Sequence, residues 1–215
     1  MGDGMNTEIE AKFPVPDVAT VQARLAARGG RLAVPWELET NVLWDFPGRT
    51  LDRQRQLLRL RQVGGMALLT FKEPGRGEDA RLKTMAEVQT SVGDAATMAC
   101  IFQKLGLVPV WRYEKFRSVW HLTFPQGQAA VCLDIVPCGQ FVEIEASPEA
   151  VHRAAAVLGL VWGKDTAATY RDLHQRWLRG QGLPDDTPMV FLPEQVRFWA
   201  EQLGIAWDKG LHNTI

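Results

Sequence analysis

Five residues near the start of the chain, Glu8-Ile9-Glu10-Ala11-Lys12, alternate strictly between charged and apolar side chains. Successive side chains of a β-strand point to opposite faces, so Glu8, Glu10 and Lys12 would share one face. Two carboxylates can hold a divalent cation, and an ammonium group can bind an anion. The same alternation is typical of an ordinary strand with one face in solvent, and for this stretch taken alone the solvated strand is the favoured interpretation.

Charged pairs of the same spacing recur along the chain: Arg59 and Arg61, Lys115 and Arg117, and Glu143 and Glu145. Lys72 and Asp134 are single charged residues on two further predicted strands, and the residue between the two charges of each pair is apolar. A solvated outer face would explain scattered polar residues, but not ordered pairs of one sign on each strand. Acids and bases that face one another are costly if dry and unpaired. A polyanion with a divalent ion would satisfy both sets, because the bases bind phosphate oxygens and the acids hold the metal.

The elements that would carry these residues can be read from hydrophobic periodicity and from turn and cap residues. Strands are expected at 8–13, 37–46, 57–63, 66–72, 83–92, 110–122, 128–136 and 140–146, with a hairpin at Gly64-Gly65. Helices are expected after the caps Asp17, Asp94 and Ser147, and at 165–179 and 193–203, with a loop at 49–56. About eight alternating strands indicate an antiparallel sheet or barrel whose charged face is open to water or lines a wet lumen.

Composition sets the broad class. The 215 residues carry a formal net charge of −1, so no overall field recruits nucleic acid or an anionic membrane. The three cysteines form no CxxC pair, which argues against zinc and disulfides and favours buried thiols in a reducing compartment. No apolar run reaches membrane-spanning length, so we expect a soluble cytoplasmic protein with no membrane partner. The four histidines show no ligand spacing, and the tryptophans are expected to pack in the core.

Taken together, these motifs resemble the CYTH family, also called triphosphate tunnel metalloenzymes. The resemblance covers about residues 5–178 and rests on Glu8-x-Glu10-x-Lys12, Leu58-Arg59-Leu60-Arg61, Thr70-Phe71-Lys72, Lys115-Phe116-Arg117, Leu133-Asp134 and Phe141-Val142-Glu143-Ile144-Glu145. It implies an α+β fold, an eight-stranded antiparallel β-tunnel with a charged lumen and helices outside. Gly139 to Glu145 and Thr169 to Leu173 look most like the class IV adenylate cyclase branch. Met85-Ala86-Glu87 departs from relatives that often carry an arginine there.

The resemblance also implies roles for individual residues. Mg²⁺ or Mn²⁺ would be bound by Glu8, Glu10, Asp134, Glu143 and Glu145. The triphosphate would be bound by Lys12, Arg59, Arg61, Lys72, Lys83, Lys115 and Arg117. Glu143, Glu145 and Lys12 are the expected catalytic groups. Lys83 and Glu87 follow a glycine-bearing loop that leaves their register open, and Tyr170 is expected to pack a helix.

The expected organisation is a tunnel domain at 1–179 and a linker with a short helical extension at 180–215. This extension would plug one tunnel mouth or form a homodimer contact. The expected function is class IV cyclase-like conversion of ATP to cyclic AMP and pyrophosphate. The alternatives are hydrolysis of tripolyphosphate, thiamine triphosphate or a nucleoside triphosphate, an idle nucleotide- or polyphosphate-binding tunnel, and a purely structural barrel.

Overall fold

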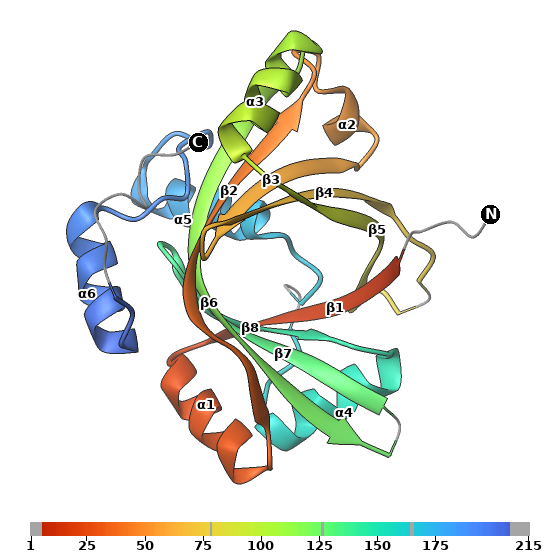
Figure 1. Cartoon of the computed structure of the whole chain (residues 1–215). Helices are drawn as coiled ribbons and strands as arrows, with labels where there is room; N and C mark the ends of the chain where they lie inside the picture. The colour runs from red at the N-terminus through yellow and green to blue at the C-terminus, as the bar shows by residue number, and fades with distance from the viewer. Residues whose placement is uncertain (1–5, 78, 126, 164–165, 207–215) are drawn as a thin grey trace.

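Eight antiparallel strands close into a barrel in the computed structural model, which describes residues 6–77, 79–125, 127–163 and 166–206 (Figure 1). The strands are β1 (Asn6–Val15), β2 (Arg31–Asp45), β3 (Leu57–Val63), β4 (Met66–Pro74), β5 (Lys83–Val92), β6 (Val108–Phe124), β7 (Gly127–Val136) and β8 (Gly139–Glu145). Around the barrel they follow the order β1-β5-β4-β3-β2-β6-β7-β8, and β8 returns to β1. The predicted eight-stranded antiparallel barrel is confirmed.

Six helices surround the barrel in the described part of the chain: α1 (Val18–Ala27), α2 (Thr50–Arg53), α3 (Ala95–Lys104), α4 (Pro148–Leu158), α5 (Tyr170–Gln181) and α6 (Pro193–Leu203). The predicted caps Asp17, Asp94 and Ser147 each accept hydrogen bonds from backbone N–H groups of the first turn. None of these helices is long and apolar enough to cross a membrane.

The hydrophobic core lies between the outer face of the barrel and the helices, not inside the barrel. Val142 and Ile144 of β8 are fully buried in one cluster with Leu25 of α1 and Leu158 of α4. Figure 1 shows α1 and α4 together beneath the wall formed by β1, β7 and β8. Because period-2 alternation turns the apolar side chains outward to the helices, the intervening charged side chains must face the lumen.

Strand register places opposite charges beside one another. Lys12 of β1 is the direct cross-strand partner of Glu143 in β8, and Glu10 is the partner of Glu145. Arg117 of β6 lies opposite Asp134 of β7. Directly opposed side chains lie within contact distance, so the ladder alone assembles an interior of alternating acids and bases.

The structure corrects two element boundaries. Strand β2 begins at Arg31 rather than at 37, because bulges between Leu32 and Glu37 accommodate Pro35 within the strand. The helix expected at 165–179 begins at Tyr170 and ends at Gln181, because Thr169 and Asp172 form a capping box. Residue 165 itself lies outside the described residues.

The expected loop at 49–56 is also wrong in part, because it contains the short helix α2. The carboxylate of Asp45 accepts hydrogen bonds from the backbone N–H groups of Phe46, Leu51 and Asp52. This side chain supplies partners for the first turn of a helix too short to be stable alone.

The segment after α5 completes the wall of the barrel from outside. Strand β6 pairs with β7 only from Phe116 onward, which leaves its first half without β7 as a neighbour. Met189 covers that edge: its N–H donates to the carbonyl of Arg112 at 3.1 Å, and its carbonyl accepts from Glu114 at 2.8 Å. The described lining of the lumen ends at Gln175, and the role expected for residues 180–215 at a tunnel mouth or in a homodimer stays a prediction.

Candidate active site

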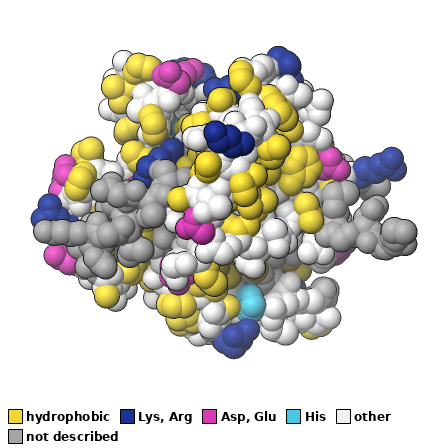
Figure 2. All heavy atoms as spheres, turned by 45° about the horizontal axis from the view of Figure 1, so that its top comes forward, with side chains coloured by type: hydrophobic (Ala, Val, Ile, Leu, Met, Phe, Trp, Pro, Cys, Tyr) yellow, Lys and Arg dark blue, Asp and Glu magenta, His cyan; other side chains and the backbone are white. Residues whose placement is uncertain are grey.

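The lumen of the barrel is a cavity of about 1110 Å³ that holds the charged residues expected from the sequence. The lining includes Glu8, Glu10, Lys12, Arg59, Arg61, Lys72, Lys83, Lys115, Arg117, Glu143 and Glu145. Asp134 is fully buried and hydrogen-bonded to the lining residues Lys115 and Arg117. The solvated-face interpretation is therefore excluded, and charge is gathered inside. On the outer face in Figure 2, charged side chains are instead scattered singly or in small groups.

Three lumen carboxylates lie close enough to share one cation. One oxygen from each of Glu8, Glu10 and Glu145 falls within 4.8 Å of the others. Burial, and then the neighbouring acids, raise the pKa of Glu145 to about 7. Oxygen ligands and carboxylate crowding of this kind suit a hard divalent ion such as Mg²⁺ or Mn²⁺, which would relieve the repulsion. The residues present therefore fit the metal that the sequence led us to expect.

A second group brings Cys132 within the same distance of Glu143 and Glu145. Burial raises the pKa of the Cys132 thiol well above its usual range, which keeps the thiol protonated. A protonated thiol is a poor metal ligand, so this group adds little to the carboxylate site.

Lys12 and Glu143 form a close ion pair in the middle of the lumen, with Nζ 2.5 Å from Oε1. Burial alone would lower the pKa of Lys12, but Glu143 and Glu10 outweigh it and raise this pKa. Arg117 also forms ion pairs with Glu143 and with Asp134. Lys12, Lys115 and Arg117 therefore meet at one cluster of acids.

Lys72 of β4 and Lys83 of β5 form ion pairs with carboxylates on the side of the lumen where β1 adjoins β5. Lys83 Nζ donates to Glu10 at 2.8 Å, and Lys72 forms ion pairs with Glu8 and, at 2.6 Å, with Glu87. Burial alone would raise the pKa of Glu10, but Lys83 and Lys12 lower it to about 2. The open register question is thus resolved, because both Lys83 and Glu87 face the lumen.

Arg59 differs from the other six bases predicted to bind the triphosphate, because the partners described for it are all neutral. Its guanidinium donates to the hydroxyls of Tyr113 at 3.3 Å and Thr70 at 3.4 Å, and its Nε has no partner. Among the described residues, no carboxylate lies within 4.0 Å of it. A buried guanidinium without an acid partner is suited to an incoming anion.

Glu39 and Tyr113 are lumen groups to which the sequence analysis gave no role. Glu39 binds Arg61 at 3.1 Å and Lys115 at 3.7 Å. Burial alone would raise its pKa, but Arg61 and Lys115 lower it to about 2. The alternation Glu37-x-Glu39-x-Asn41 in β2 was a usable signal, since it repeats the pattern of β1.

Tyr170 packs α5 against the barrel, as expected, but it also enters the lumen. Its hydroxyl donates to Asp134 at 2.5 Å, and Lys12 Nζ lies 4.4 Å from the centre of its ring. Burial and the Asp134 carboxylate raise the pKa of this hydroxyl well above its usual range, so the hydroxyl keeps its proton.

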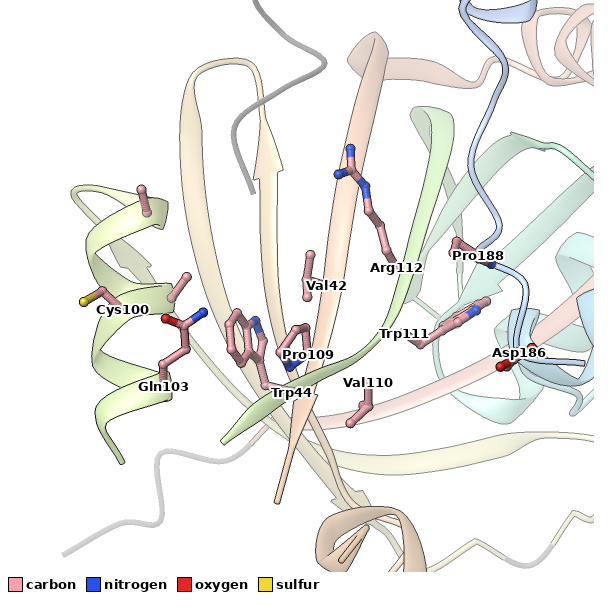
Figure 3. A pocket seen from close by; sticks show the side chains of 12 residues that line it. Val42, Trp44, Cys100, Gln103, Pro109, Val110, Trp111, Arg112, Asp186 and Pro188 are labelled. Atoms are coloured by element: carbon pink, nitrogen blue, oxygen red, sulfur yellow. The ribbon is translucent and has the colours of Figure 1, made fainter. Parts of the chain in front are cut away.

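A second cavity of about 600 Å³ lies outside the barrel, between α3, β2, β6 and the segment around Pro188 (Figure 3). Its lining is mainly apolar and shares Trp44, Val110 and Trp111 with the lumen. Trp44 packs edge-on against Phe102 of α3, consistent with the core role expected for the tryptophans. The remaining polar groups include Gln103, Arg112 and Asp186, so this cavity lacks the charge density of the lumen.

The sequence profile described as the CYTH domain matches residues 6–159. The chain belongs to the CYTH domain family. A Methanocaldococcus jannaschii protein named "Putative adenylate cyclase MJ0240" is 25% identical to this CYTH protein over 151 residues, which cover 70% of this chain and 83% of the relative.

Solved structures share the fold. One from Vibrio parahaemolyticus, described as a "putative adenylate cyclase", has a TM-score of 0.64 at 18% identity, covering 79% of this chain and 98% of the other. One from Hippeastrum, described as a "putative adenylyl cyclase" with a dominant triphosphatase activity, has a TM-score of 0.50 at 15% identity, covering 93% and 97%. At these identities the two structures support the tunnel architecture alone.

Proposed function

We propose that this CYTH protein is a divalent-metal-dependent enzyme that converts a triphosphate inside its lumen. One observation carries the proposal: ten basic side chains, among them the seven expected from the sequence, and a cluster of three carboxylates line one cavity. Phosphoryl transfer needs positioning and charge neutralisation more than covalent participation by the protein. Bases along a phosphate chain, beside a site for its cation, supply both.

The first candidate reaction is class IV cyclase-like, in which the ribose 3′-hydroxyl of ATP attacks the α-phosphate and pyrophosphate leaves. The basic groups would bind the phosphate oxygens: Lys12, Arg59, Arg61, Lys72, Lys83, Lys115 and Arg117. Glu8, Glu10 and Glu145 would hold the metal, together with Asp134 and Glu143 as the sequence suggests. Bound Mg²⁺ or Mn²⁺ would supply charge neutralisation at the reacting phosphate.

Glu143 and Glu145 are the candidate proton acceptors, and Lys12 is the candidate cation at the reacting phosphate. Glu143 accepts from both Lys12 and Arg117, so its carboxylate is held ionised and in place at the centre of the lumen. Burial alone would raise the pKa of Glu143, but Arg117 and Lys12 lower it well below its usual range. Glu143 is therefore the weaker base of the two, and Glu145, whose pKa is raised to about 7, is the better-matched proton acceptor.

Hydrolysis is the second candidate, with water attacking the terminal phosphate. The charged middle of the lumen offers groups that recognise phosphate and metal, which tripolyphosphate could fill along its whole length. Met85 lines the cavity where relatives often carry an arginine, so one phosphate contact is replaced by an apolar side chain. An idle binding tunnel is the remaining alternative.

The test is incubation with ATP, tripolyphosphate and thiamine triphosphate, with and without Mg²⁺ or Mn²⁺, followed by identification of the products. Cyclic AMP with pyrophosphate supports the cyclase, and orthophosphate supports the hydrolase. Tight binding without turnover supports the idle tunnel. Arg59→Met should abolish turnover, whereas Lys104→Met, on the exposed surface of α3, should retain it. Equal activity of the two variants would contradict a lumen site.

A further inference from the structure

Tyr170 is the first residue of α5 and lies beyond residues 6–159, which the family profile matches. Its side chain is nevertheless buried among the proposed binding groups. Lys12 Nζ lies 4.4 Å and Lys115 Nζ lies 5.3 Å from the centre of its ring. Its hydroxyl donates to Asp134, which also accepts from Lys115 at 3.3 Å. One aromatic side chain therefore contacts two ammonium groups and a carboxylate.

We propose that Tyr170 is a positioning residue for triphosphate binding, whose ring fixes the ammonium groups of Lys12 and Lys115 at the spacing that the phosphates require. The proposal rests on the function proposed above and adds that α5 carries part of the binding site.

Lysine has a flexible stem of four carbons, and its side chain loses much conformational entropy when it is held in one geometry. A ring face attracts ammonium groups through its quadrupole, and the attraction is strongest where water is excluded. Lys12 is 2% exposed and Lys115 is 3% exposed, so both contacts lie in such surroundings. A ring that holds both groups before the substrate arrives removes part of the ordering cost of binding.

The ring is itself held from several sides. Phe141 packs edge-on against it with the ring centres 5.5 Å apart. The capping box of Thr169 and Asp172 fixes the start of α5. Just before α5, the carbonyl of Thr166 accepts from the backbone N–H of Lys12 at 2.8 Å. The segment that leads into α5 therefore contacts Lys12 through its main chain as well as through the ring.

Packing alone is the competing explanation, since Tyr170 belongs to an apolar cluster with Trp111, Val136 and Met189. The two explanations differ in which substitution matters. Phenylalanine keeps the ring over both lysines and loses only the hydroxyl contact with Asp134. Leucine keeps an apolar side chain of useful size and loses the ring.

The experiment compares wild type, Tyr170→Phe, Tyr170→Leu and Leu178→Ala. Leu178 is fully buried on α5 but does not line the lumen, so it controls for loss of α5 packing. The probe is inorganic tripolyphosphate, titrated calorimetrically in the presence of EDTA so that binding is read without metal. Steady-state KM and kcat with Mg²⁺ provide the second readout.

We expect Tyr170→Leu to weaken tripolyphosphate binding about tenfold or more and Tyr170→Phe by no more than about threefold, because only the former loses both cation–π contacts. We expect Leu178→Ala to lower the melting temperature while leaving affinity within about twofold of wild type. KM should rise more than kcat falls in Tyr170→Leu. The double variant Tyr170→Leu/Lys115→Met should lose less binding free energy than the sum of the two single variants, because both changes disrupt the same ring–ammonium contact.

Unchanged affinity in Tyr170→Leu, with normal binding by wild type, would overturn the positioning role and leave the proposed function intact. Equal losses in Tyr170→Phe and Tyr170→Leu would also overturn it, since the hydroxyl and not the ring would then be responsible. A loss in Leu178→Ala as large as in Tyr170→Leu would assign the effect to packing. Failure of wild type to bind any triphosphate would refute the proposed function, and the positioning role with it.

Discussion

Lys12 and Glu143 are direct cross-strand partners in β1 and β8, and the ammonium of one lies 2.5 Å from the carboxylate of the other. The lumen thus neutralises its own bases while no substrate is bound. An entering phosphate must compete with that carboxylate for Lys12, so each internal ion pair lowers the affinity of the lumen for anions.

Glu143→Gln should therefore strengthen metal-free binding of tripolyphosphate by about tenfold, because Lys12 and Arg117 lose a competing negative charge. Turnover should fall, since Glu143 is a candidate proton acceptor and metal ligand. Calorimetry in EDTA measures the first effect and product formation the second. Glu201→Gln, at an exposed position on α6, is the matched loss of charge and should change neither. Weaker binding by Glu143→Gln would contradict the competition.

Arg59 and Arg61 should respond differently to the same substitution. Arg59 has only hydroxyl partners, whereas Arg61 pairs with Glu39 and Asn41. Arg59→Met should reduce tripolyphosphate affinity by about a hundredfold with little loss of stability, since a charged pair with a desolvated anion is worth about 2–5 kcal/mol. Arg61→Met should destabilise the protein more. Calorimetry and urea unfolding on both variants test the contrast, which fails if the order of the stability losses is reversed.

Glu145→Gln should raise the melting temperature of the metal-free protein, because it removes one of three crowded carboxylates. A relief of about 1 kcal/mol corresponds to about 2–4 °C for a chain of this size. The same variant should lose most of the stabilisation that Mn²⁺ gives to wild type. Thermal scans with and without Mn²⁺ measure both. An unchanged Mn²⁺ shift would mean that the ion binds elsewhere.

Stability at acid pH should depend on Glu39. Its pKa in the folded protein is about 2, below the ordinary 4.5, so its ionised form contributes stability above pH 4.5. That contribution is lost as the pH falls from 4.5 toward 2. The difference in unfolding free energy between wild type and Glu39→Gln should therefore shrink between about pH 6 and about pH 3. Urea unfolding measures it, and a pH-independent difference would contradict the assignment.

The segment beyond α5 should be necessary for stability. Phe191 is 5% exposed and packs against Phe116 of β6, whereas Phe198 of α6 is 53% exposed. Phe191→Ala should cost about 3–5 kcal/mol of unfolding free energy, because it leaves a cavity in the core. Phe198→Ala should change stability by no more than about 0.5 kcal/mol. Comparable losses in the two variants would show that the segment does not pack as described.

Strand alternation predicted the barrel and the lumen face well, because period-2 patterning is a local property of the sequence. The charged pairs at Arg59 and Arg61, or at Glu143 and Glu145, needed only their own strand to be placed. The roles assigned to them by resemblance remain predictions for the experiments above.

Non-local contacts were not predictable in the same way. Helix α2 depends on Asp45, and the position of Tyr170 depends on where α5 docks, which no local pattern encodes. Strand β2 begins before Pro35 because bulges around this residue let the strand continue without a hydrogen bond from the proline nitrogen. The partners of Glu39 lie on β3 and β6, and its role appeared only once the ladder order was known.

Met189 offers β6 one amide and one carbonyl, and any extended peptide could offer the same two groups. Without this residue, the backbone N–H of Glu114 and the carbonyl of Arg112 in β6 would lose these partners and could form hydrogen bonds with a strand of a neighbouring molecule. Because Met189 satisfies this part of β6, we expect removal of the segment after α5 to promote self-association through the exposed strand as well as unfolding.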